Sequence, residues 1–499
     1  MTISLLLEMA VSGNPDRLAL VSDDVRLTVG ELNALADGCA GALVGSGPRT
    51  VAYVGTGGVM LPLLIFASAR AALPFSPLNY RLSGEALREL IDRLDEPLVV
   101  CDSEYRDVAE DAATKIIESQ DLLSAARTSN PVSLFPDPDD VAVLLFTSGT
   151  TSRPKAVELS HNNLTGYVTG TVEFDSAAPD DAVLICVPPY HIAGVSAALS
   201  NLYAGRKMVY QRNFEPKDWI RLVNAESVTN ATVVPTMLNR IVTELERNPV
   251  PVPTLRSLAY GGSKVAPPLL RKALELLPDV GFVNAYGLTE TSSTIAVLTA
   301  QDHRAAQTAT DEMVRKRLAS VGQPVPGIEV EIRGDDGEVL DRGQVGELFV
   351  RGPQVSGRYA EIGSVLDENG WFPTRDSAML DQDGYLFITG RADDTIIRGG
   401  ENVAPAEVED VLVEHPAVRE VAVVGIEDPE WGQIIAAVVV PEYGTTPDPE
   451  ELRDHVRKAL RGSRTPDRVV FRQQLPVTPT GKVLRRELVN DLTGERAGR

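Results

Sequence analysis

A run of small and hydroxyl-bearing residues followed by a lysine could hold phosphate. The apolar pair Leu145-Phe146 leads into Thr147-Ser148-Gly149-Thr150-Thr151-Ser152, and then come Arg153-Pro154-Lys155. Backbone N–H and hydroxyl groups in such a run can donate to phosphate oxygens, and Lys155 adds a positive charge. Gly149 is not followed by Gly-Lys-Ser/Thr at the Walker A spacing, which excludes a P-loop NTPase. An ordinary turn between two strands is the alternative interpretation.

Apolar runs between residues 182 and 287 end in proline, glycine, hydroxyl or histidine residues. We predict that these runs are strands alternating with helices. The residues that follow or end them are Pro188-Pro189-Tyr190-His191, Pro235-Thr236, Gly261-Gly262 and Tyr286-Gly287. Because ligands of doubly wound sheets lie at the carboxyl ends of the strands, we expect these residues to converge on one crevice.

The same alternation is present near the N-terminus. Residues 18–21 and 51–54 are predicted strands, and between them lies a predicted helix over residues 31–45. Thr28 and Glu31 have the spacing of a capping box, in which each side chain accepts from the other residue's backbone. The N-terminal region is therefore predicted to be α/β.

Two segments imitate other classes of protein. Residues 55–60 resemble a dinucleotide fingerprint, but Met60 stands where the last glycine should fall, so we interpret them as a strand-to-helix turn. The apolar run 61–72 is too short to span a membrane and predicts a buried helix.

The pattern changes after about residue 322. Shorter strands separated by Asp-Gly turns predict a small antiparallel sheet or barrel, and two amphipathic helices with further strands fill the last hundred residues. The predicted fold is therefore α/β, with two doubly wound α/β subdomains over residues 1–320, a small β-barrel-like subdomain over 321–390, and an α+β domain over 395–499.

Composition limits the partners and the compartment. The formal charge is −23 and the pI is near 4.7, which argues against nucleic-acid binding, so any anionic ligand needs a locally basic site. The N-terminus has no Lys or Arg before its apolar residues and reaches Glu8 early, so we expect neither a signal peptide nor a membrane span. Cys39, Cys101 and Cys186 are predicted to be buried thiols in a reducing compartment, and a cytoplasmic location is expected.

Several motifs in a fixed order resemble the adenylate-forming superfamily of acyl-CoA synthetases, luciferases and peptide-synthetase adenylation domains. The resemblance extends from Thr28 to Leu488. Beyond the loop that ends at Lys155, the motifs are Pro189-Tyr190-His191, Tyr286-Gly287-Leu288-Thr289-Glu290, Trp371-Phe372-Pro373-Thr374-Arg375-Asp376, Gly390-Arg391-Ala392-Asp393-Asp394, Gly399-Gly400-Glu401-Asn402 and Pro479-Thr480-Gly481-Lys482.

The resemblance implies an enzyme with two half-reactions. ATP and a carboxylic acid form an acyl-adenylate with release of pyrophosphate, and the acyl group then passes to CoA. Residues 1–390 would be the AMP-binding region, residues 391–394 a hinge centred on Asp393, and residues 395–499 a mobile C-terminal domain. Glycines at Gly399 and Gly400 would let the pantetheine of CoA pass close to the backbone.

The resemblance also assigns the nucleotide site. Lys482, Glu290 and His191 would be catalytic, with Lys482 between substrate carboxylate and α-phosphate and Glu290 on the Mg²⁺ that accompanies ATP. An exposed surface lysine, a helix-end carboxylate and a core histidine are the structural alternatives. The ATP- and AMP-binding residues would be Thr147, Ser148, Gly149, Thr150, Thr151, Lys155, Gly261, Gly262, Ala285, Tyr286, Gly287, Thr289, Asp376, Arg391 and Lys482.

The acyl pocket implied by the resemblance is mostly small or apolar. Its residues would be His191, Ile192, Ala193, Gly194, Val195, Val234, Pro235, Thr236, Ser293 and Thr294. Because none of them is acidic, the pocket favours a fatty or other apolar acid over an amino acid, whose ammonium group would need a buried carboxylate. The segment His191–Gly194 is also similar to ligases that act on aromatic acids.

Three positions depart from the usual motifs. Glycine is usual at Ser152, Ala156 and Arg375, so we expect a stiffer phosphate loop and an added charge near the ribose site. The leading hypothesis is an acid–CoA ligase of fatty acid metabolism. The alternatives are an aryl-acid–CoA ligase, a stand-alone enzyme that loads an acyl carrier protein, and a non-catalytic nucleotide-binding relative.

The hinge assignment makes a testable prediction. The substitution Asp393→Pro fixes a backbone angle and should block rotation of the C-terminal domain. We expect near-normal acyl-adenylate formation, measured by pyrophosphate exchange, and at least about tenfold slower thioester formation. Equal loss in both half-reactions would contradict the hinge assignment.

Overall fold

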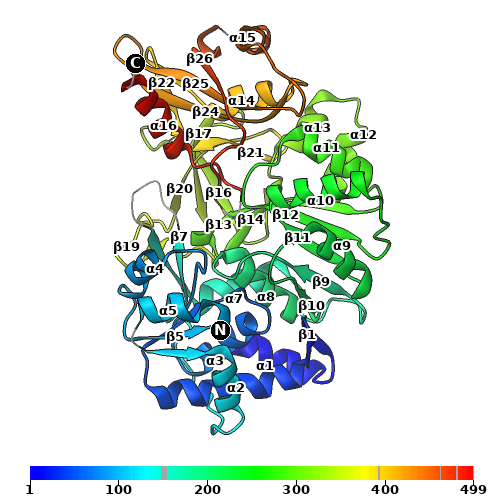
Figure 1. The fold of residues 1–499 in the computed structure, drawn as a ribbon, viewed down its shortest axis with the longest axis vertical. Coiled ribbons are helices and arrows are strands. Elements are labelled where there is room, and N and C mark those ends of the chain that lie inside the picture. The colour runs from blue at the N-terminus through cyan, green and yellow to red at the C-terminus, as the bar shows by residue number, and fades with distance from the viewer. Residues whose placement is uncertain (114, 148–153, 392–393, 461, 479–480, 498–499) are drawn as a thin grey trace.

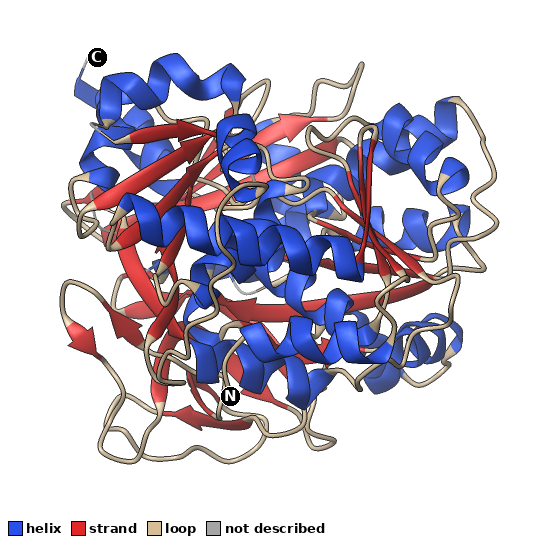
Figure 2. Cartoon of the chain, turned by 90° about the horizontal axis from the view of Figure 1, so that it is seen from below, coloured by secondary structure: helices blue, strands red, loops and turns tan. Residues whose placement is uncertain are grey.

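The computed structural model describes residues 1–499 except 114, 148–153, 392–393, 461, 479–480 and 498–499. A large body formed by most of the chain carries a smaller C-terminal domain at one end (Figure 1). Helices lie on both sides of the main sheets in the two views (Figures 1 and 2). The predicted α/β class is confirmed. Within the described residues, no helix is long and apolar enough to cross a membrane.

One sheet of the large body carries the predicted phosphate loop. Its strand order is β19-β18-β8-β7-β4-β3-β5-β6. The strands are β3 (Thr50–Val54), β4 (Phe75–Leu78), β5 (Pro97–Cys101), β6 (Ile116–Glu118), β7 (Val141–Thr147), β8 (Lys155–Ser160), β18 (Arg358–Tyr359) and β19 (Gly363–Ser364). Helices α1 (Ser4–Gly13), α2 (Val29–Ser46), α3 (Met60–Arg70), α4 (Gly84–Ile91), α5 (Arg106–Ala112), α6 (Ser119–Ala126) and α7 (His161–Thr171) belong to the same half of the chain.

The second large sheet contains the strands at whose carboxyl ends the crevice is predicted. Its order is β15-β14-β13-β12-β11-β9-β10-β1-β2. The strands are β1 (Leu18–Ser22), β2 (Val25–Thr28), β9 (Ala182–Ile185), β10 (Lys207–Tyr210), β11 (Asn230–Val233), β12 (Ser257–Gly261), β13 (Gly281–Leu288), β14 (Ser293–Leu298) and β15 (Gln323–Pro324). Its helices are α8 (Ile192–Ala204), α9 (Pro216–Ala225), α10 (Pro235–Arg247), α11 (Pro267–Leu276), α12 (Ala300–Thr308) and α13 (Glu312–Lys316).

Local sequence signals account for the N-terminal helices. Thr28 and Glu31 form the predicted capping box at the start of α2, and Gly47 ends that helix in the left-handed conformation at φ 66°. Every residue of α3 is buried, as predicted for the apolar run 61–72. Helix α1 was not predicted, because its short apolar run was considered only as a possible signal peptide.

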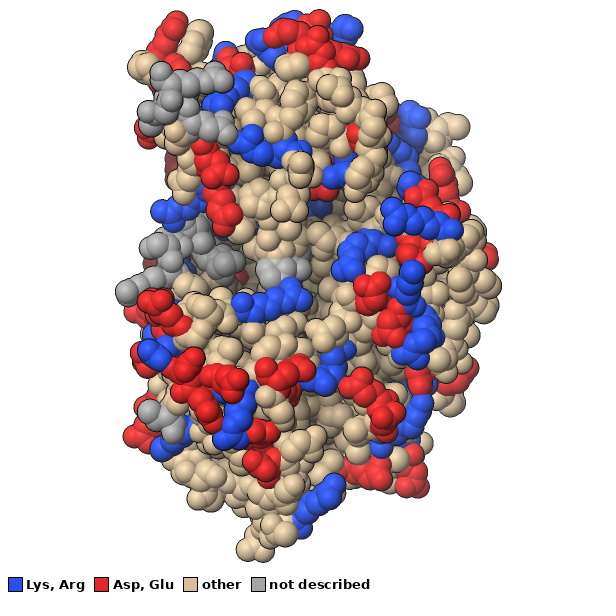
Figure 3. All heavy atoms as spheres, in the orientation of Figure 1, with Lys and Arg blue, Asp and Glu red and all other residues tan. Residues whose placement is uncertain are grey.

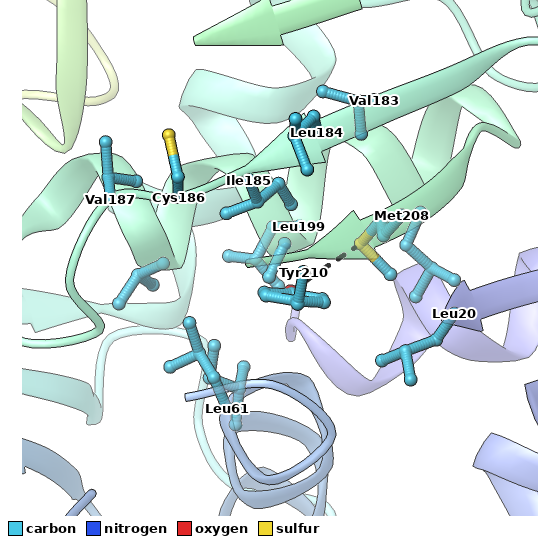
Figure 4. Close-up of a cluster of buried hydrophobic side chains, with 14 of the residues drawn as sticks. Leu20, Leu61, Val183, Leu184, Ile185, Cys186, Val187, Leu199, Met208 and Tyr210 are labelled. Atoms are coloured by element: carbon cyan, nitrogen blue, oxygen red, sulfur yellow. Dashed lines mark hydrogen bonds between the residues drawn. The ribbon is translucent and has the colours of Figure 1, made fainter. Parts of the chain in front are cut away.

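The two large sheets share one core. Leu20 of β1, Leu61 of α3 and Leu199 of α8 belong to a single cluster of buried side chains (Figure 4). Met208 of β10 packs in the same cluster. All three cysteines are buried and free, as predicted. The two α/β subdomains are therefore joined by continuous packing and not merely by a linker.

The smaller elements differ in detail from the prediction. Strands β16 (Glu329–Arg333), β17 (Val345–Arg351), β20 (Phe372–Leu380) and β21 (Leu386–Arg391) form an antiparallel sheet in the order β16-β17-β20-β21. Within the predicted subdomain 321–390, however, β15, β18 and β19 join the two larger sheets. The structural units are thus not continuous segments of the chain.

The C-terminal domain is an α+β unit. Strands β22 (Ile396–Arg398), β23 (Glu401–Val403), β24 (Val418–Asp428), β25 (Gly432–Pro441) and β26 (Arg468–Phe471) form its sheet. Helices α14 (Pro405–Val413) and α15 (Pro449–Ala459) match the two helices predicted over residues 405–414 and 449–460. Helix α16 (Arg485–Ala497) was not predicted, and its Leu488 and Leu492 pack one turn apart against the sheet.

Candidate active site

At the carboxyl ends of β12 and β13, the backbone of the neighbouring strand lies too close to Gly261 and Gly287 for either residue to carry a side chain. Gly261 pairs with Ala285, and a Cβ at Gly261 would lie 2.3 Å from the Ala285 carbonyl oxygen. A Cβ at Gly287 would lie 1.8 Å from the Ser293 carbonyl oxygen, because β13 and β14 shift register there. Only glycine therefore fits at these two positions, and Gly262 follows at φ +86°.

Tyr286, Asp376 and Arg391 meet next to the carboxyl end of β13. The Tyr286 hydroxyl donates to Asp376 Oδ2 at 2.5 Å, and Arg391 Nη1 lies 3.2 Å from Asp376 Oδ1. Burial raises the pKa of the Asp376 carboxyl, and Arg391 opposes that shift. Among the described residues, Arg391 Nε is buried without a hydrogen-bond partner. This cluster combines an aromatic face, a carboxylate and a cation.

The backbone conformation of Arg375 explains why glycine is usual at this position. Its φ is 63°, in the left-handed region that costs a non-glycine residue energy. The Glu347 carboxylate accepts the Arg375 N–H at 3.2 Å and lies 3.8 Å from Arg375 Nε. The Arg375 side chain is 61% exposed, so much of its charge faces solvent.

Lys482 of the C-terminal domain reaches the same cluster. Its backbone N–H donates to Thr478 Oγ1 at 3.1 Å in a turn where Gly481 has φ +82°. Residue Lys482 as a whole is exposed, but protein atoms around its ammonium group partly desolvate it and so lower its pKa. The positive charge of Arg391 lowers that pKa further. Asp376 and Asp394 act in the opposite direction. The cation of the C-terminal domain is therefore electrostatically coupled to the Asp376 carboxylate.

Contacts between the large body and the C-terminal domain hold Lys482 in this place. Lys264 Nζ lies 2.6 Å from Asp410 Oδ1, and Arg271 Nη2 lies 2.8 Å from Glu414 Oε2. Both acids are on or next to α14, whereas both bases are on or near α11. The predicted CoA glycines lie elsewhere: the Gly399 N–H donates to the Trp431 carbonyl within the C-terminal domain.

The phosphate loop connects two antiparallel strands. Thr147 ends β7 and pairs with Lys155 at the start of β8, while the predicted residues Ser148, Gly149, Thr150, Thr151 and Ser152 lie outside the described residues. Ala156 pairs with Phe146 as an ordinary strand residue, so its backbone does not require glycine. Asp393, the predicted hinge, also lies outside the described residues.

Two residues that sequence reasoning missed hold the backbone on both sides of Lys155. Arg93 Nη1 donates to the Pro154 carbonyl at 2.8 Å, and the Glu361 carboxylate accepts the Ala156 N–H at 3.3 Å. Arg93 and Glu361 also pair with each other. These residues line an open hollow of about 510 Å³ beside Lys155. They are far apart in sequence, and no local motif marks them.

Glu290 lies in a short helical turn, Thr289–Thr291. Its carboxylate accepts a hydrogen bond from Tyr359, and its backbone carbonyl accepts one from the Ser356 N–H at 2.9 Å. No cluster of three or more His, Cys, Asp or Glu side chains suited to a metal occurs among the described residues. A single carboxylate suits Mg²⁺ that takes its other ligands from water and phosphate oxygens.

His191 lies at the N-terminal end of α8. It is the N-cap residue of that helix, whereas the preceding strand ends earlier, at Ile185. Burial lowers the pKa of His191 to about 4, so its ring is neutral at pH 7. Within the described part of the chain, its Nε2 is buried without a hydrogen-bond partner, and the Tyr190 ring lies 4.5 Å away.

The predicted acyl-pocket residues begin two helices and one strand. Ile192, Ala193, Gly194 and Val195 form the first turn of α8, while Val234, Pro235 and Thr236 begin α10. Ser293 and Thr294 begin β14, and the Ser196 hydroxyl donates to Ser293 Oγ at 3.1 Å. Val195 is fully buried in the main core. Thr236 faces the Lys482 turn, because its Cγ2 would lie 2.6 Å from a Cβ at Gly481.

The chain was compared with known families, sequences and structures. The AMP-binding enzyme family matches residues 7–360, and the AMP-binding enzyme C-terminal domain matches residues 407–482. The chain is 33% identical over 485 residues to a feruloyl-CoA synthase from an Amycolatopsis species, covering 95% of this chain and 96% of that protein. It is 32% identical over 482 residues to a fatty acid–[acyl-carrier-protein] ligase from Streptomyces coeruleorubidus, covering 94% and 91%.

A solved structure agrees with these sequence matches. The o-succinylbenzoate CoA synthetase from Bacillus subtilis, in complex with its acyl-adenylate intermediate, superposes with a TM-score of 0.84 at 28% identity, covering 97% of both chains. The chain belongs to the AMP-binding enzyme family, the adenylate-forming acyl-CoA synthetases. Its enzyme class is that of the AMP-forming acid–CoA ligases, which confirms the predicted class.

The contact between Gly481 and Thr236 gives a prediction about adenylation. Gly481→Ala would place a methyl group 2.6 Å from Thr236 Cγ2 and displace the Lys482 turn. We expect pyrophosphate exchange to fall about 100-fold, because misplacing a catalytic group by about 1 Å can cost that much. Thioester formation from supplied acyl-adenylate should change little.

Two variants separate displacement from backbone strain. Gly444 has a similar φ of +77° but open space around it, so Gly444→Ala should leave pyrophosphate exchange near normal. Adding Thr236→Ala to Gly481→Ala removes the obstructing atoms and should restore much of the lost rate. Failure of this rescue would show that strain, and not the contact, causes the loss.

Proposed function

We propose that this protein activates a carboxylic acid with ATP and transfers the acyl group to CoA. A carboxylate oxygen of the acid attacks the α-phosphorus of ATP, and the bond to pyrophosphate breaks. The CoA thiol, as its thiolate, then attacks the acyl carbon, and AMP leaves. The observation that supports this proposal most strongly is the meeting of Lys482 with Asp376 and Arg391 at the crevice.

The nucleotide residues have distinct tasks. Tyr286 stacks the adenine over the space left by Gly261 and Gly262, and Asp376 accepts from the ribose hydroxyls. Lys482 neutralises the two anions that must approach each other in the first half-reaction. Thr147 to Thr151, Lys155 and Thr289 bind near the phosphates.

A bound Mg²⁺ would neutralise phosphate oxygens and orient the triphosphate. Glu290 is the residue that would hold it, with water and phosphate oxygens as its other ligands. Lys155, whose ammonium lies over the Tyr359 ring, would add a cation near the phosphates. His191, neutral at pH 7, would separate the phosphate end of the crevice from the acyl pocket.

The second half-reaction requires a different arrangement of the C-terminal domain. Lys482 occupies the crevice, whereas Gly399 and Gly400 lie on the β22–β23 turn beside Trp431. Rotation about the hinge at residues 391–394 would withdraw Lys482 and bring the glycine pair to the pantetheine. The ion pairs Lys264–Asp410 and Arg271–Glu414 would break during that rotation.

The substrate is proposed to be an acid with a largely apolar body. The pocket residues from Ile192 to Val195 and from Val234 to Thr236 include no charged side chain. Two similar proteins are named for the feruloyl group and for o-succinylbenzoate, and both contain an aromatic ring. Aryl acids are therefore the first class to test. Fatty acids are the second class, supported by the similar carrier-protein ligase. We propose a cytoplasmic location.

An acyl carrier protein is the alternative acceptor. The relative from Streptomyces coeruleorubidus is named for that acceptor, and the match covers 94% of this chain. This chain has a formal charge of −23, so its overall field would repel a carrier protein that is itself acidic. Acidic and basic side chains are interspersed on the face shown in Figure 3, which offers no large basic area. CoA is the proposed acceptor, because feruloyl-CoA synthase and the o-succinylbenzoate CoA synthetase are named for it.

The substrate proposal can be tested with hydroxamate trapping. Purified protein, ATP and Mg²⁺ are incubated with matched aryl, fatty and dicarboxylic acids, and hydroxylamine captures any acyl-adenylate. We expect the highest rate with an apolar aryl or fatty acid and thioester formation when CoA is added. No adenylate with any acid would contradict the proposed function, and turnover only with a carrier protein would identify the other acceptor.

The role of Lys482 gives a second test. Lys482→Ala removes the cation beside Asp376, and we expect adenylate formation to fall by about 100-fold or more. Thioester formation from supplied acyl-adenylate should remain largely intact. Lys458→Ala, which removes an exposed lysine of α15, serves as the matched control. Unchanged pyrophosphate exchange in Lys482→Ala would show that the assigned role is wrong.

A further inference from the structure

Tyr359 connects Glu290 and Lys155, the two residues proposed to serve the metal and the phosphates of ATP. Its hydroxyl donates to Glu290 Oε1 at 2.8 Å. Lys155 Nζ lies 5.2 Å from the centroid of the Tyr359 ring, within the range of a cation–π contact. Tyr359 is only 8% exposed. One buried side chain therefore contacts both the carboxylate and the cation.

The backbone around Tyr359 fixes its position. Tyr359 pairs with Val157 of β8, the strand that begins at Lys155. The Ser356 N–H donates to the Glu290 carbonyl at 2.9 Å, and the Ser356 hydroxyl donates to the Glu158 carbonyl. The segment from Ser356 to Tyr359 is thus bonded both to the exit of the phosphate loop and to the turn that carries Glu290.

We propose that Tyr359 is a positioning residue for the metal-bound triphosphate. Its hydroxyl engages one oxygen of Glu290 and so orients the carboxylate toward the phosphates. The aromatic face holds the Lys155 ammonium at a fixed distance from the same carboxylate. This inference rests on the proposed function, because it assumes that Glu290 and Lys155 serve the metal and phosphates of ATP.

The chemistry of the phenol suits this task. Burial and the neighbouring Glu290 both raise the pKa of Tyr359, so the hydroxyl remains protonated and donates at every ordinary assay pH. A hydrogen bond to an ionised acceptor is stronger than one between neutral groups. Without this donor, the Glu290 side chain would lose a fixed orientation while keeping its charge. Loss of the Tyr359 hydroxyl should therefore lower the affinity for Mg²⁺ more than the affinity for ATP itself.

The chain contains a matched control for this arrangement. The Tyr385 hydroxyl donates to Asp302 Oδ1 at 2.7 Å, and Arg317 lies 4.3 Å from the Tyr385 ring centroid. Tyr385 therefore has the same combination of carboxylate acceptor and cation over the ring. None of these three residues belongs to the proposed nucleotide site. Loss of its hydroxyl should test structural effects alone.

The experiment measures ATP binding by calorimetry with and without Mg²⁺. We expect Tyr359→Phe to weaken binding of ATP with Mg²⁺ about tenfold, the cost of one hydrogen bond to a charged group, and to leave binding of metal-free ATP unchanged. Tyr385→Phe should match the wild type in both conditions. A wild-type protein that binds no ATP with Mg²⁺ would contradict the proposed function and not this inference alone.

Two results would overturn the positioning role. One is equal affinity of Tyr359→Phe and wild type for ATP with Mg²⁺, and the other is equal weakening with and without the metal. Tyr359→His, which keeps a ring and a shorter donor, gives a second variant if the phenylalanine variant unfolds, and its affinity should be intermediate. Near-ultraviolet circular dichroism checks the fold of each variant.

A double-mutant cycle tests whether Tyr359 acts through Glu290. In a Glu290→Ala background, which lacks the acceptor of the Tyr359 hydroxyl, the added Tyr359→Phe substitution should cause less than about a twofold further loss of affinity for ATP with Mg²⁺, since neighbouring residues in one network are not additive. A full tenfold further loss would show that Tyr359 acts independently of Glu290 and would overturn the proposal.

Discussion

Electrostatic repulsion between two anions is the constraint on which this crevice depends. A carboxylate must approach the phosphates of ATP on a chain whose formal charge is −23. Cations must therefore be local and must lie where the anions meet. Arg391 comes from the end of β21, Lys155 from the start of β8 and Lys482 from the C-terminal domain. These three segments, distant in sequence, together supply the local positive charge that the strongly negative chain otherwise lacks.

Lys482 differs from the other two cations in how its backbone is held. Lys155 and Arg391 belong to strands of the large body, where sheet pairing fixes the backbone. Lys482 stands on a turn of the C-terminal domain, which is joined to the large body through exposed ion pairs such as Lys264–Asp410. Exposed pairs contribute roughly 0–1 kcal/mol each, so they favour this orientation without making it permanent. That balance is consistent with the proposed role of Lys482 in only the first of the two half-reactions.

Sequence predicted the fold class, the capping box at Thr28 and the buried helix after Met60, because each depends on local periodicity or capping. It also predicted that Tyr286 and Asp376 belong to one site, and the structure brings them into contact, although their roles stay predictions. The partners of Lys155 and Glu290 could not be found in this way. Tyr359 reaches them only through the pairing of β18 with β8, which joins residues about 200 positions apart.

The departures from family motifs show the same limit. Ala156 is an ordinary strand residue, so the expected stiffening has no basis at that position. Arg375 does occupy the left-handed region where glycine is usual, and its N–H is held by Glu347. Sequence alone could note both substitutions but could not tell which of them strains the backbone. The strain depends on backbone angles that only the tertiary structure determines.

The exchange of strands between the two large sheets has a consequence for the order of folding. Strands β1 and β2 pair beside β10, and β18 pairs beside β8, so each sheet needs segments made early and late during synthesis. Such long-range pairing slows folding, because loop closure must precede the contacts that stabilise it. The edge of the sheet beside the phosphate loop therefore stays unpaired until the ribosome has passed residue 359. During that interval, a nascent chain exposes an unpaired strand edge, which is the kind of surface on which other chains can pair and aggregate.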